Sequence, residues 1–306
     1  MHPIDSVQIN FNQEQLLILN ICLAFLMFGV ALDLRLDNFR DIFRRPKAPL
    51  IGLTSQLILL PILTLALIYI FRPPTSLALG MILIASCPGG NVSNFAVHIA
   101  KANAALSVIM TSVTTLGAIL ITPLYFTFLA PMIAAKEDLP EAIFVSPLDM
   151  VTTIVQLILV PLLLGMLIND RFPQFTEKIK KPVRWISLLI FFGFVVFAVY
   201  GNWDNIVQYL YLVFFLVLVH NALALLMGYN FARLNKLPQN DARAISLETG
   251  IQNSGLGLIL IFNFFDGLGG MAMIAAWWGV WHLLSAFTLA TWWSSRKVAQ
   301  LKVQEV

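Results

Sequence analysis

The chain has 306 residues, of which 59% are hydrophobic and only 11% are charged. A soluble domain of this length carries roughly 25% charged residues, so the composition excludes an ordinary water-soluble protein. The net charge is only +3, and the basic residues follow the loops of a membrane protein, so no nucleic-acid partner is expected. Cys22 and Cys87 both lie in apolar segments, which excludes a disulfide framework or a cysteine metal site.

Nine apolar segments are long enough to cross the hydrocarbon core of a bilayer as helices. In chain order they cover residues 15–33, 48–71, 76–98, 104–130, 147–168, 185–201, 206–231, 243–265 and 268–293. The short alternating segments of a transmembrane β-barrel are absent from the sequence. The prediction is an all-α membrane protein whose nine transmembrane helices form a single domain over 1–306.

Lysine and arginine concentrate on one side of this arrangement. Loops 34–47, 99–103 and 169–184, segment 232–243 and the C-terminal tail hold 17 of the 19 basic residues, and only Arg72 and Lys136 lie on the other side. The positive-inside rule then places the N-terminus outside and the C-terminus in the cytoplasm. We expect a multi-pass protein of the plasma (inner) membrane.

The third segment is interrupted near its middle. Residues 87–94 read Cys-Pro-Gly-Gly-Asn-Val-Ser-Asn, so a proline and two glycines weaken the helix just before three polar side chains. Unpaired backbone groups are costly in hydrocarbon, and an unwound segment is tolerated only where it lines a cavity or the protein interior. A simple proline kink is the alternative, but the polar side chains favour an unwound binding segment.

The eighth segment contains a second interruption, where residues 246–257 read Ser-Leu-Glu-Thr-Gly-Ile-Gln-Asn-Ser-Gly-Leu-Gly. Glu248 is the one acidic residue well inside a predicted span, and such a residue indicates a functional site by default. The alternative is a glutamate at the cytosolic end that reaches toward water or pairs with Arg243. Because the polar run continues inward from Glu248, we expect a binding role.

The two interruptions are related to each other. Asn94 and Asn253 lie 159 residues apart, and their segments start on opposite sides of the membrane. This pattern is typical of inverted-topology repeats whose broken helices cross near the midplane; segments one to four then match six to nine, and the fifth is a connector. The similarity of 56–61 (Gln-Leu-Ile-Leu-Leu-Pro) to 156–161 (Gln-Leu-Ile-Leu-Val-Pro) does not fit this scheme, and we interpret it as chance or convergent composition.

Broken helices of this kind offer two kinds of ligand. Free carbonyls at half-helix C-termini coordinate small cations, and free N–H groups at half-helix N-termini suit a carboxylate. One carboxylate among many neutral oxygens favours a monovalent ion such as Na⁺, whereas Ca²⁺ commonly recruits several carboxylates. Ser107 and Thr111 share one helix face and are further candidate oxygens, as is Gln56. His220 is more typical of a buried hydrogen-bonding residue, and the role of His282 stays open.

These motifs, together with Gln56 and Pro61, Leu106 with Ser107 and Thr111, and the Trp281-His282 pair, resemble the bile acid:sodium symporter family over residues 18–293. The resemblance implies a panel domain and a core domain, with the broken helices crossing in the core. The panel would comprise 15–33, 147–168, 185–201 and parts of 48–71 and 206–231. The core would comprise about 76–130 and 243–293 with adjoining helices.

The resemblance also implies two sodium sites and a substrate site beside the crossing. The residues of the first sodium site would be Ser93, Asn94, Ser107, Thr111 and Glu248. The second site would use the side chains of Gln56, Glu248 and Gln252 and the backbone carbonyls of Thr249 and Ile251. The substrate residues would be Asn91, Val92, Asn253 and His282. The family often has threonine where Asn91 stands and a polar residue where Leu283 stands, so the details of substrate binding differ here.

The function predicted from these residues is sodium-coupled symport of an organic anion, either bile-acid-like or a small carboxylate, by a monomer that uses alternating access. A proton-coupled carrier, or an anion or metalloid exporter of related architecture, is the alternative. An intramembrane enzyme is disfavoured, because the spans hold no His-Glu-x-x-His, Asp-rich or Ser/His/Asp arrangement and Glu248 lacks a catalytic partner.

Overall fold

The computed structural model describes residues 3–8, 13–32, 46–90, 92–134, 146–201 and 203–304. Regular structure in these ranges is helical, apart from two isolated β-bridges. The helices of the first half are η1 (Pro3–Ser6, a 3₁₀ turn), α1 (Gln13–Ala31), α3 (Lys47–Thr54), η2 (Ser55–Leu59), α4 (Leu60–Phe71), α5 (Thr75–Ser86), α6 (Val92–Ile99), α7 (Ala104–Leu129) and α8 (Pro131–Ala134). Those of the second half are α9 (Pro147–Ile154), η4 (Val155–Leu159), α10 (Val160–Arg171), α11 (Pro173–Gly201), α12 (Trp203–Leu234), α13 (Gln239–Gly250), α14 (Ser254–Phe264) and α15 (Gly269–Gln304).

Several of these helices have the length and apolar composition of membrane-spanning helices. Five continuous helical stretches of the described chain are long and apolar enough to cross a membrane, namely 47–71, 104–133, 148–171, 209–234 and 269–295. Three shorter helices, 16–29, 75–86 and 254–264, are also apolar. The prediction of an all-α membrane protein is confirmed, and the count of nine transmembrane helices stays a prediction.

Large apolar side chains cover the outer surface of these helices. Ile70 on α4 and Phe128 on α7 are 69% and 68% exposed, and α1 and α10 expose further leucines and isoleucines. Such surfaces would be costly in water and are expected against lipid.

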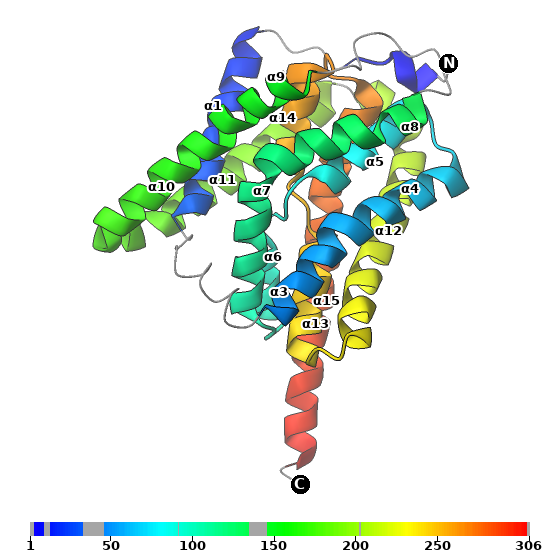
Figure 1. Cartoon of the computed structure of the whole chain (residues 1–306). Coiled ribbons are helices and arrows are strands. Elements are labelled where there is room, and N and C mark those ends of the chain that lie inside the picture. Colours follow the sequence, from blue (N-terminus) through cyan, green and yellow to red (C-terminus); the bar gives the residue numbers. More distant parts are fainter. Residues whose placement is uncertain are drawn as a thin grey trace.

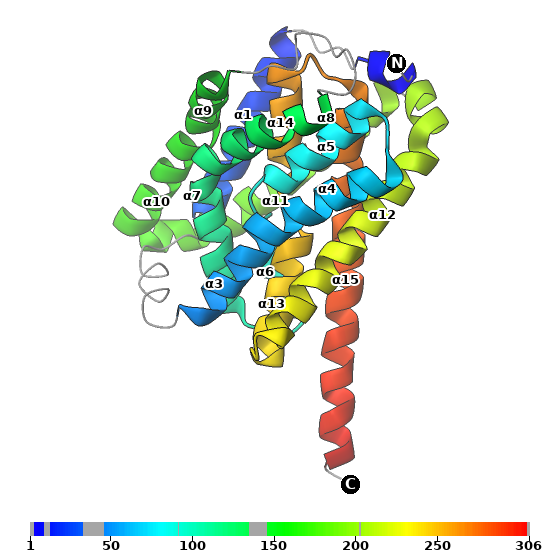
Figure 2. The same ribbon diagram turned by 45° about the vertical axis from the view of Figure 1, so that its right-hand side comes forward.

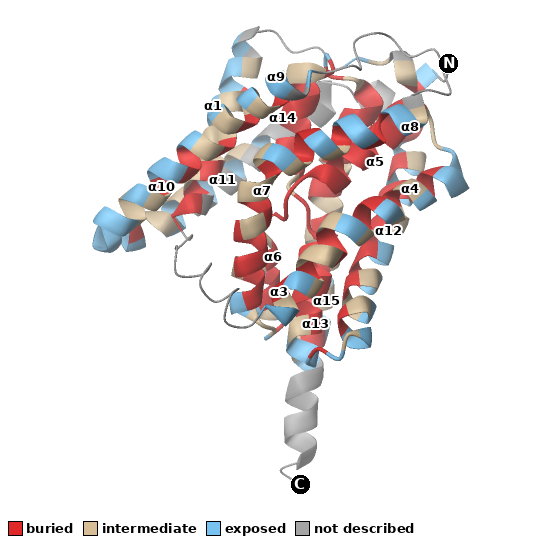
Figure 3. Ribbon diagram, viewed as in Figure 1, coloured by how far each residue is buried: buried red, intermediate tan, exposed pale blue. Residues whose placement is uncertain are grey.

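Two groups of helices pack against each other. Helix α1 contacts α10 and α11, and these three lie together at one side of the molecule (Figure 1). Helix α12 contacts α13, α15 and α3–α4, and α15 also contacts α5, α6 and α14. The two views agree that the chain termini lie at opposite ends (Figure 2). Buried residues concentrate in the second group, where α5, α6, α13 and α14 meet α15 (Figure 3).

The predicted loop between the fifth and sixth apolar segments differs from the structure. Segment 169–184, expected as a loop, is mostly helical because α11 begins at Pro173. Its lysines are good helix formers, and Lys180 Nζ lies 2.5 Å from Glu177 Oε1 in an i,i+3 pair. The basic residues expected in this loop therefore lie mostly within a helix.

The repeated Gln-Leu-Ile-Leu-x-Pro sequence forms the same local structure twice. Residues 55–59 and 155–159 are single π-helical turns, each placed just before a proline, Pro61 or Pro161. A proline ring clashes with the carbonyl four residues earlier and cannot donate to it, and a wider turn relieves that clash. The two glutamines nevertheless differ in environment, since Gln56 is buried and Gln156 is exposed.

Both predicted helix breaks are present. Helix α5 ends at Ser86, Cys87 is extended (φ −72°, ψ 157°), and α6 begins only at Val92. A residue before a proline avoids the helical region, which explains the end of α5 at this point. Helix α13 ends at Gly250, Ile251 is extended (φ −110°, ψ 108°), and α14 begins at Ser254. The proline-kink alternative is therefore wrong.

Candidate functional site

The two breaks cross each other as a short antiparallel pair. Gly89 faces Gln252 in an isolated β-bridge. The Gly90 N–H donates to the Ile251 carbonyl (3.0 Å), and the Asn253 N–H donates to the Pro88 carbonyl (2.8 Å). The unwound segments thus satisfy each other's backbone groups inside the protein, as a membrane interior requires.

Close approach at the crossing depends on glycine. A Cβ added at Gly90 would lie 3.0 Å from the Gln252 carbonyl oxygen. One added at Gly89 would lie 3.0 Å from both Gln56 Nε2 and Glu248 Oε2. The crossing, Gln56 and the Glu248 carboxylate are therefore immediate neighbours.

Glu248 is fully buried near the end of α13, and three hydroxyls surround its carboxylate. Ser93 Oγ donates to Oε1 (2.5 Å), Ser107 Oγ also donates to Oε1, and Thr111 Oγ1 lies 3.1 Å from Oε1 and 3.0 Å from Oε2. No basic side chain among the described residues forms an ion pair with it. Arg243 instead lies over the Trp293 ring, 5.5 Å from its centroid. The alternative of a Glu248–Arg243 pair is wrong.

Asn94 completes this first group, because Ser107 Oγ also lies 2.8 Å from Asn94 Oδ1. Three helices therefore contribute the five oxygen-bearing side chains expected at the first sodium site: α6, α7 and α13. A hydroxyl can turn from donating to accepting, so each of these oxygens can offer a lone pair to a cation beside the carboxylate. The donor set, one carboxylate with neutral oxygens, fits a monovalent ion.

The residues expected at the second sodium site also lie together. Gln56 Nε2 donates to Gln252 Oε1 (3.4 Å), and Gln252 Nε2 donates to the Thr249 carbonyl (3.0 Å). Gln56 Oε1 is buried and has no hydrogen-bond partner among the described residues. A buried amide oxygen without a donor is costly, and a cation would supply the missing partner. This second group therefore also fits Na⁺.

The residues expected to bind substrate are less closely associated. Asn253 caps α14 by accepting from the Leu256 N–H (3.0 Å), and its Nδ2 lies 4.0 Å from Met27 Sδ on α1. Val92 is the first residue of α6. His282 on α15 is buried, and its Nδ1 has no hydrogen-bond partner in the described part of the chain. Asn91 lies outside the described residues.

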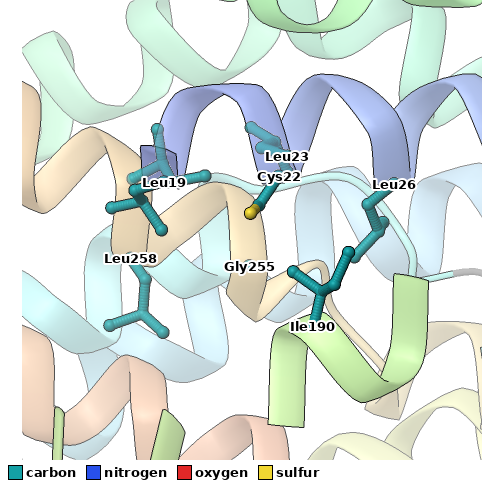
Figure 4. A pocket seen from close by; sticks show the side chains of 8 residues that line it. Leu19, Cys22, Leu23, Leu26, Ile190, Gly255 and Leu258 are labelled. Atoms are coloured by element: carbon teal, nitrogen blue, oxygen red, sulfur yellow. The ribbon is translucent and has the colours of Figure 1, made fainter. Parts of the chain in front are cut away.

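A small apolar cavity lies between α1, α11 and the first turn of α14 (Figure 4), with the Cys22 sulfur pointing into it. Its volume is about 20 Å³, which is close to the space one water molecule needs. Typical ligand pockets hold ~300–1,000 Å³, so the two groups of helices are closed on each other at this point. The lining residues are Leu19, Cys22, Leu23, Leu26, Ile190, Gly255, Leu258 and Ile259.

Two polar residues beside the crossing were not expected there from the sequence. Ser55 Oγ lies 2.9 Å from Thr249 Oγ1. Asn221 Nδ2 donates to the Gly250 carbonyl at the end of α13 (2.7 Å). Thr114 Oγ1 on α7 also lies beside the crossing, where it accepts from the Gly89 N–H (3.2 Å). Ser55 adjoins Gln56, which is the one available signal for it, whereas a lone asparagine within apolar α12 gives no indication of its partner.

Comparison with known proteins identifies the family of the chain. The model of the Sodium Bile acid symporter family matches residues 20–209. A Bacillus subtilis protein named an uncharacterized sodium-dependent transporter, YocS, is 36% identical over 278 residues, which cover 91% of this chain and 83% of that protein.

Plant proteins are also similar to this chain, at lower sequence identity. The rice (Oryza sativa subsp. japonica) "probable sodium/metabolite cotransporter BASS2, chloroplastic" is 32% identical over 276 residues, 90% of this chain and 63% of its own length. The corresponding BASS1 protein of Arabidopsis thaliana is 30% identical over 283 residues, 92% of this chain and 67% of its own length. The chain thus spans about two thirds of these plant relatives. It belongs to the sodium/bile acid symporter family, a family of sodium-dependent membrane transporters rather than enzymes.

Proposed function

We propose that this protein is a symporter that uses two Na⁺ ions to import an organic anion by alternating access. The observation that carries the proposal is the surrounding of Glu248: a fully buried carboxylate with three hydroxyl donors and no basic partner among the described residues. A buried charge of this kind needs a compensating partner. A sodium ion is the partner that the neutral oxygens around it favour.

The first ion would bind where the side chains of α6 and α7 meet Glu248. Its ligands would be Ser93, Asn94, Ser107, Thr111 and Glu248. The hydroxyls that donate to the carboxylate in this structure would turn their lone pairs toward the ion.

The second ion would bind on the opposite side of the same carboxylate, beside the π turn. Its ligands would be Gln56, Glu248, Gln252 and the carbonyls of Thr249 and Ile251. The buried, unpartnered Oε1 of Gln56 supports this assignment. Glu248 would then be shared between both ions.

The substrate would be an organic anion, either bile-acid-like or a small carboxylate, bound where α1 faces the broken helices. The N-termini of α6 and α14 would present the positive ends of their helix dipoles to this region. Asn91, Val92, Asn253 and His282 would contact it, and the position of Asn253 beside Met27 of α1 supports a site at this junction. The small cavity there would have to widen to admit a ligand.

The architecture we propose has nine transmembrane helices with inverted repeats, in a monomer of the plasma membrane with its N-terminus outside. The antiparallel sense of the Gly89–Gln252 bridge supports opposite orientations of the two broken helices. The mutual contacts of α1, α10 and α11 support a panel unit. The contacts of α12, α3 and η2 with α13 favour assigning segments 48–71 and 206–231, parts of which were expected in the panel, to the core unit instead.

Uptake with and without sodium tests this function. Substrate is first identified by thermal-shift screening of bile acids, keto acids and hydroxy acids in Na⁺, since a ligand of the folded state stabilises it by mass action. Uptake of the hit into proteoliposomes is then compared in Na⁺ and in choline at fixed pH. We expect uptake only in Na⁺, lost in Glu248→Gln and kept in the exposed control Glu177→Gln. Uptake that is insensitive to the choline exchange contradicts sodium coupling and favours the proton-coupled alternative.

A further inference from the structure

Asn221 joins three helices next to the crossing. It is buried on α12. Its Nδ2 donates to the Gly250 carbonyl at the end of α13 (2.7 Å), and its Oδ1 accepts from Ser285 Oγ on α15 (2.7 Å). The amide nitrogen and the amide oxygen of Asn221 therefore both form hydrogen bonds, which fixes the orientation of the side chain.

The carbonyls at the end of α13 need such partners because a helix leaves its last four carbonyls without intrahelical donors. The Leu247 carbonyl accepts from the Ile251 N–H (3.0 Å), and the Thr249 carbonyl accepts from the Gln252 side chain (3.0 Å). The Gly250 carbonyl lies between the carbonyls of Thr249 and Ile251, and Asn221 is its partner. The direction of this one carbonyl constrains the peptide planes on either side of it.

Helix α12 is also held against the helix that carries Gln56. His220, which precedes Asn221, has its Nε2 2.9 Å from Thr64 Oγ1, and Thr64 Oγ1 donates to the Leu60 carbonyl (2.8 Å). The His220 ring packs edge-on against Trp278 of α15, with centroids 4.9 Å apart. Consecutive residues of α12 thus tie it to α4, α13 and α15.

We infer that Asn221 is a positioning residue for the second sodium site: held by Ser285, it fixes the Gly250 carbonyl and so the Thr249 and Ile251 carbonyls that would bind the ion. Asn221 itself does not touch the ion. The inference rests on the proposed sodium function. Groups that orient metal ligands commonly change metal affinity by ~10–100-fold when they are removed.

Sodium titration of the purified full-length protein tests the inference without a known substrate. The melting temperature is followed against NaCl, with choline chloride holding ionic strength constant, to give the half-saturating Na⁺ concentration. We expect Asn221→Ala to raise that concentration about 10-fold. Ser285→Ala, which frees the Asn221 amide but leaves it in place, should raise it about 3-fold, since one hydrogen bond is worth roughly that factor or more.

Asn263→Ala is the matched control. Asn263 on α14 also forms an interhelical amide hydrogen bond, to Asn20 Oδ1 on α1 (3.0 Å), but near the far end of α14 from the crossing. It should lower the melting temperature in choline and leave the half-saturating Na⁺ concentration unchanged.

The results distinguish a failure of the proposed sodium function from a failure of the positioning role of Asn221. A wild-type protein that Na⁺ does not stabilise relative to choline contradicts the proposed function itself. A responsive wild type with unchanged half-saturation in both Asn221→Ala and Ser285→Ala overturns the positioning role, and their lower melting temperatures would then reflect packing alone. If Asn221→Ala does not fold, Ser285→Ala and Asn221→Ser decide by the same measure.

Discussion

Gly89 and Gln252 face each other in an antiparallel bridge at the point where the two broken helices cross. Gly89 brings the crossing within reach of Gln56 and Glu248, and Gln252 donates to the Thr249 carbonyl. Backbone pairing and the candidate ion ligands are therefore parts of one structure. A change at the crossing should affect ion binding as well as stability.

Gly89→Ala tests that dependence. The new Cβ would lie 3.0 Å from both Gln56 Nε2 and Glu248 Oε2, and overpacking of this kind costs about 1–3 kcal/mol. We expect a lower melting temperature and a loss of Na⁺-dependent stabilisation, both measured by thermal shift in NaCl and choline chloride.

The control for this change is Gly193→Ala on α11, where an added Cβ would meet nothing within 4 Å. Its melting temperature should stay the same or rise, because alanine favours a helix by up to ~1 kcal/mol over glycine. Normal sodium stabilisation in Gly89→Ala would show that the crossing and the ion sites are independent.

The repeated glutamine motif supplies a matched pair of variants. Gln56→Ala removes the buried, unpartnered amide oxygen from the second candidate site, whereas Gln156→Ala changes the exposed residue at the same position of the other π turn. We expect the half-saturating Na⁺ concentration to rise at least 10-fold only in Gln56→Ala, since an ion ligand should matter no less than a residue that orients one. Equal effects of the two variants on the sodium titration would assign Gln56 to helix structure rather than to ion binding.

Ser107→Ala should weaken sodium binding through the first candidate site. It removes one of three hydroxyls at the Glu248 carboxylate and a contact with Asn94. Its effect should not add to that of Thr111→Ala, whose hydroxyl contacts the same carboxylate, because neighbours that act together are not additive. The sodium titration of both single variants and the double variant gives this coupling, and strict additivity would argue against a shared site.

The candidate ion ligands can be identified from the sequence, whereas the π turns and the residues that position those ligands cannot. Glu248 and the residues around it stand out because polar side chains and glycine are exceptional in an apolar run, and both breaks lie where those residues lie. The π turns were not predicted, because the proline effect depends on how the whole turn relaxes. The role of Asn221 depends on where α12 packs, which one asparagine in an apolar helix does not reveal.

A stability prediction concerns the N-terminal turn. Asp5 Oδ1 accepts from the Ser76 N–H (2.8 Å) in the first turn of α5, and the Val7 carbonyl accepts from the Gly269 N–H (2.7 Å). Loss of a cap at a helix N-terminus costs about 1 kcal/mol. Asp5→Ala should therefore lower the melting temperature by a few degrees while the half-saturating Na⁺ concentration stays that of the wild type. A shift of the half-saturating Na⁺ concentration in this variant would link the N-terminal end of α5 to the ion sites.

Binding of radioactive sodium to the purified protein measures, without any substrate, whether Glu248 is shared by two ions. We expect saturable binding of two Na⁺ per chain in the wild type, one in Gln56→Ala, and none in Glu248→Gln, since both ions would share this carboxylate. Saturable sodium binding by a folded Glu248→Gln protein would show that this carboxylate is not the shared ion ligand.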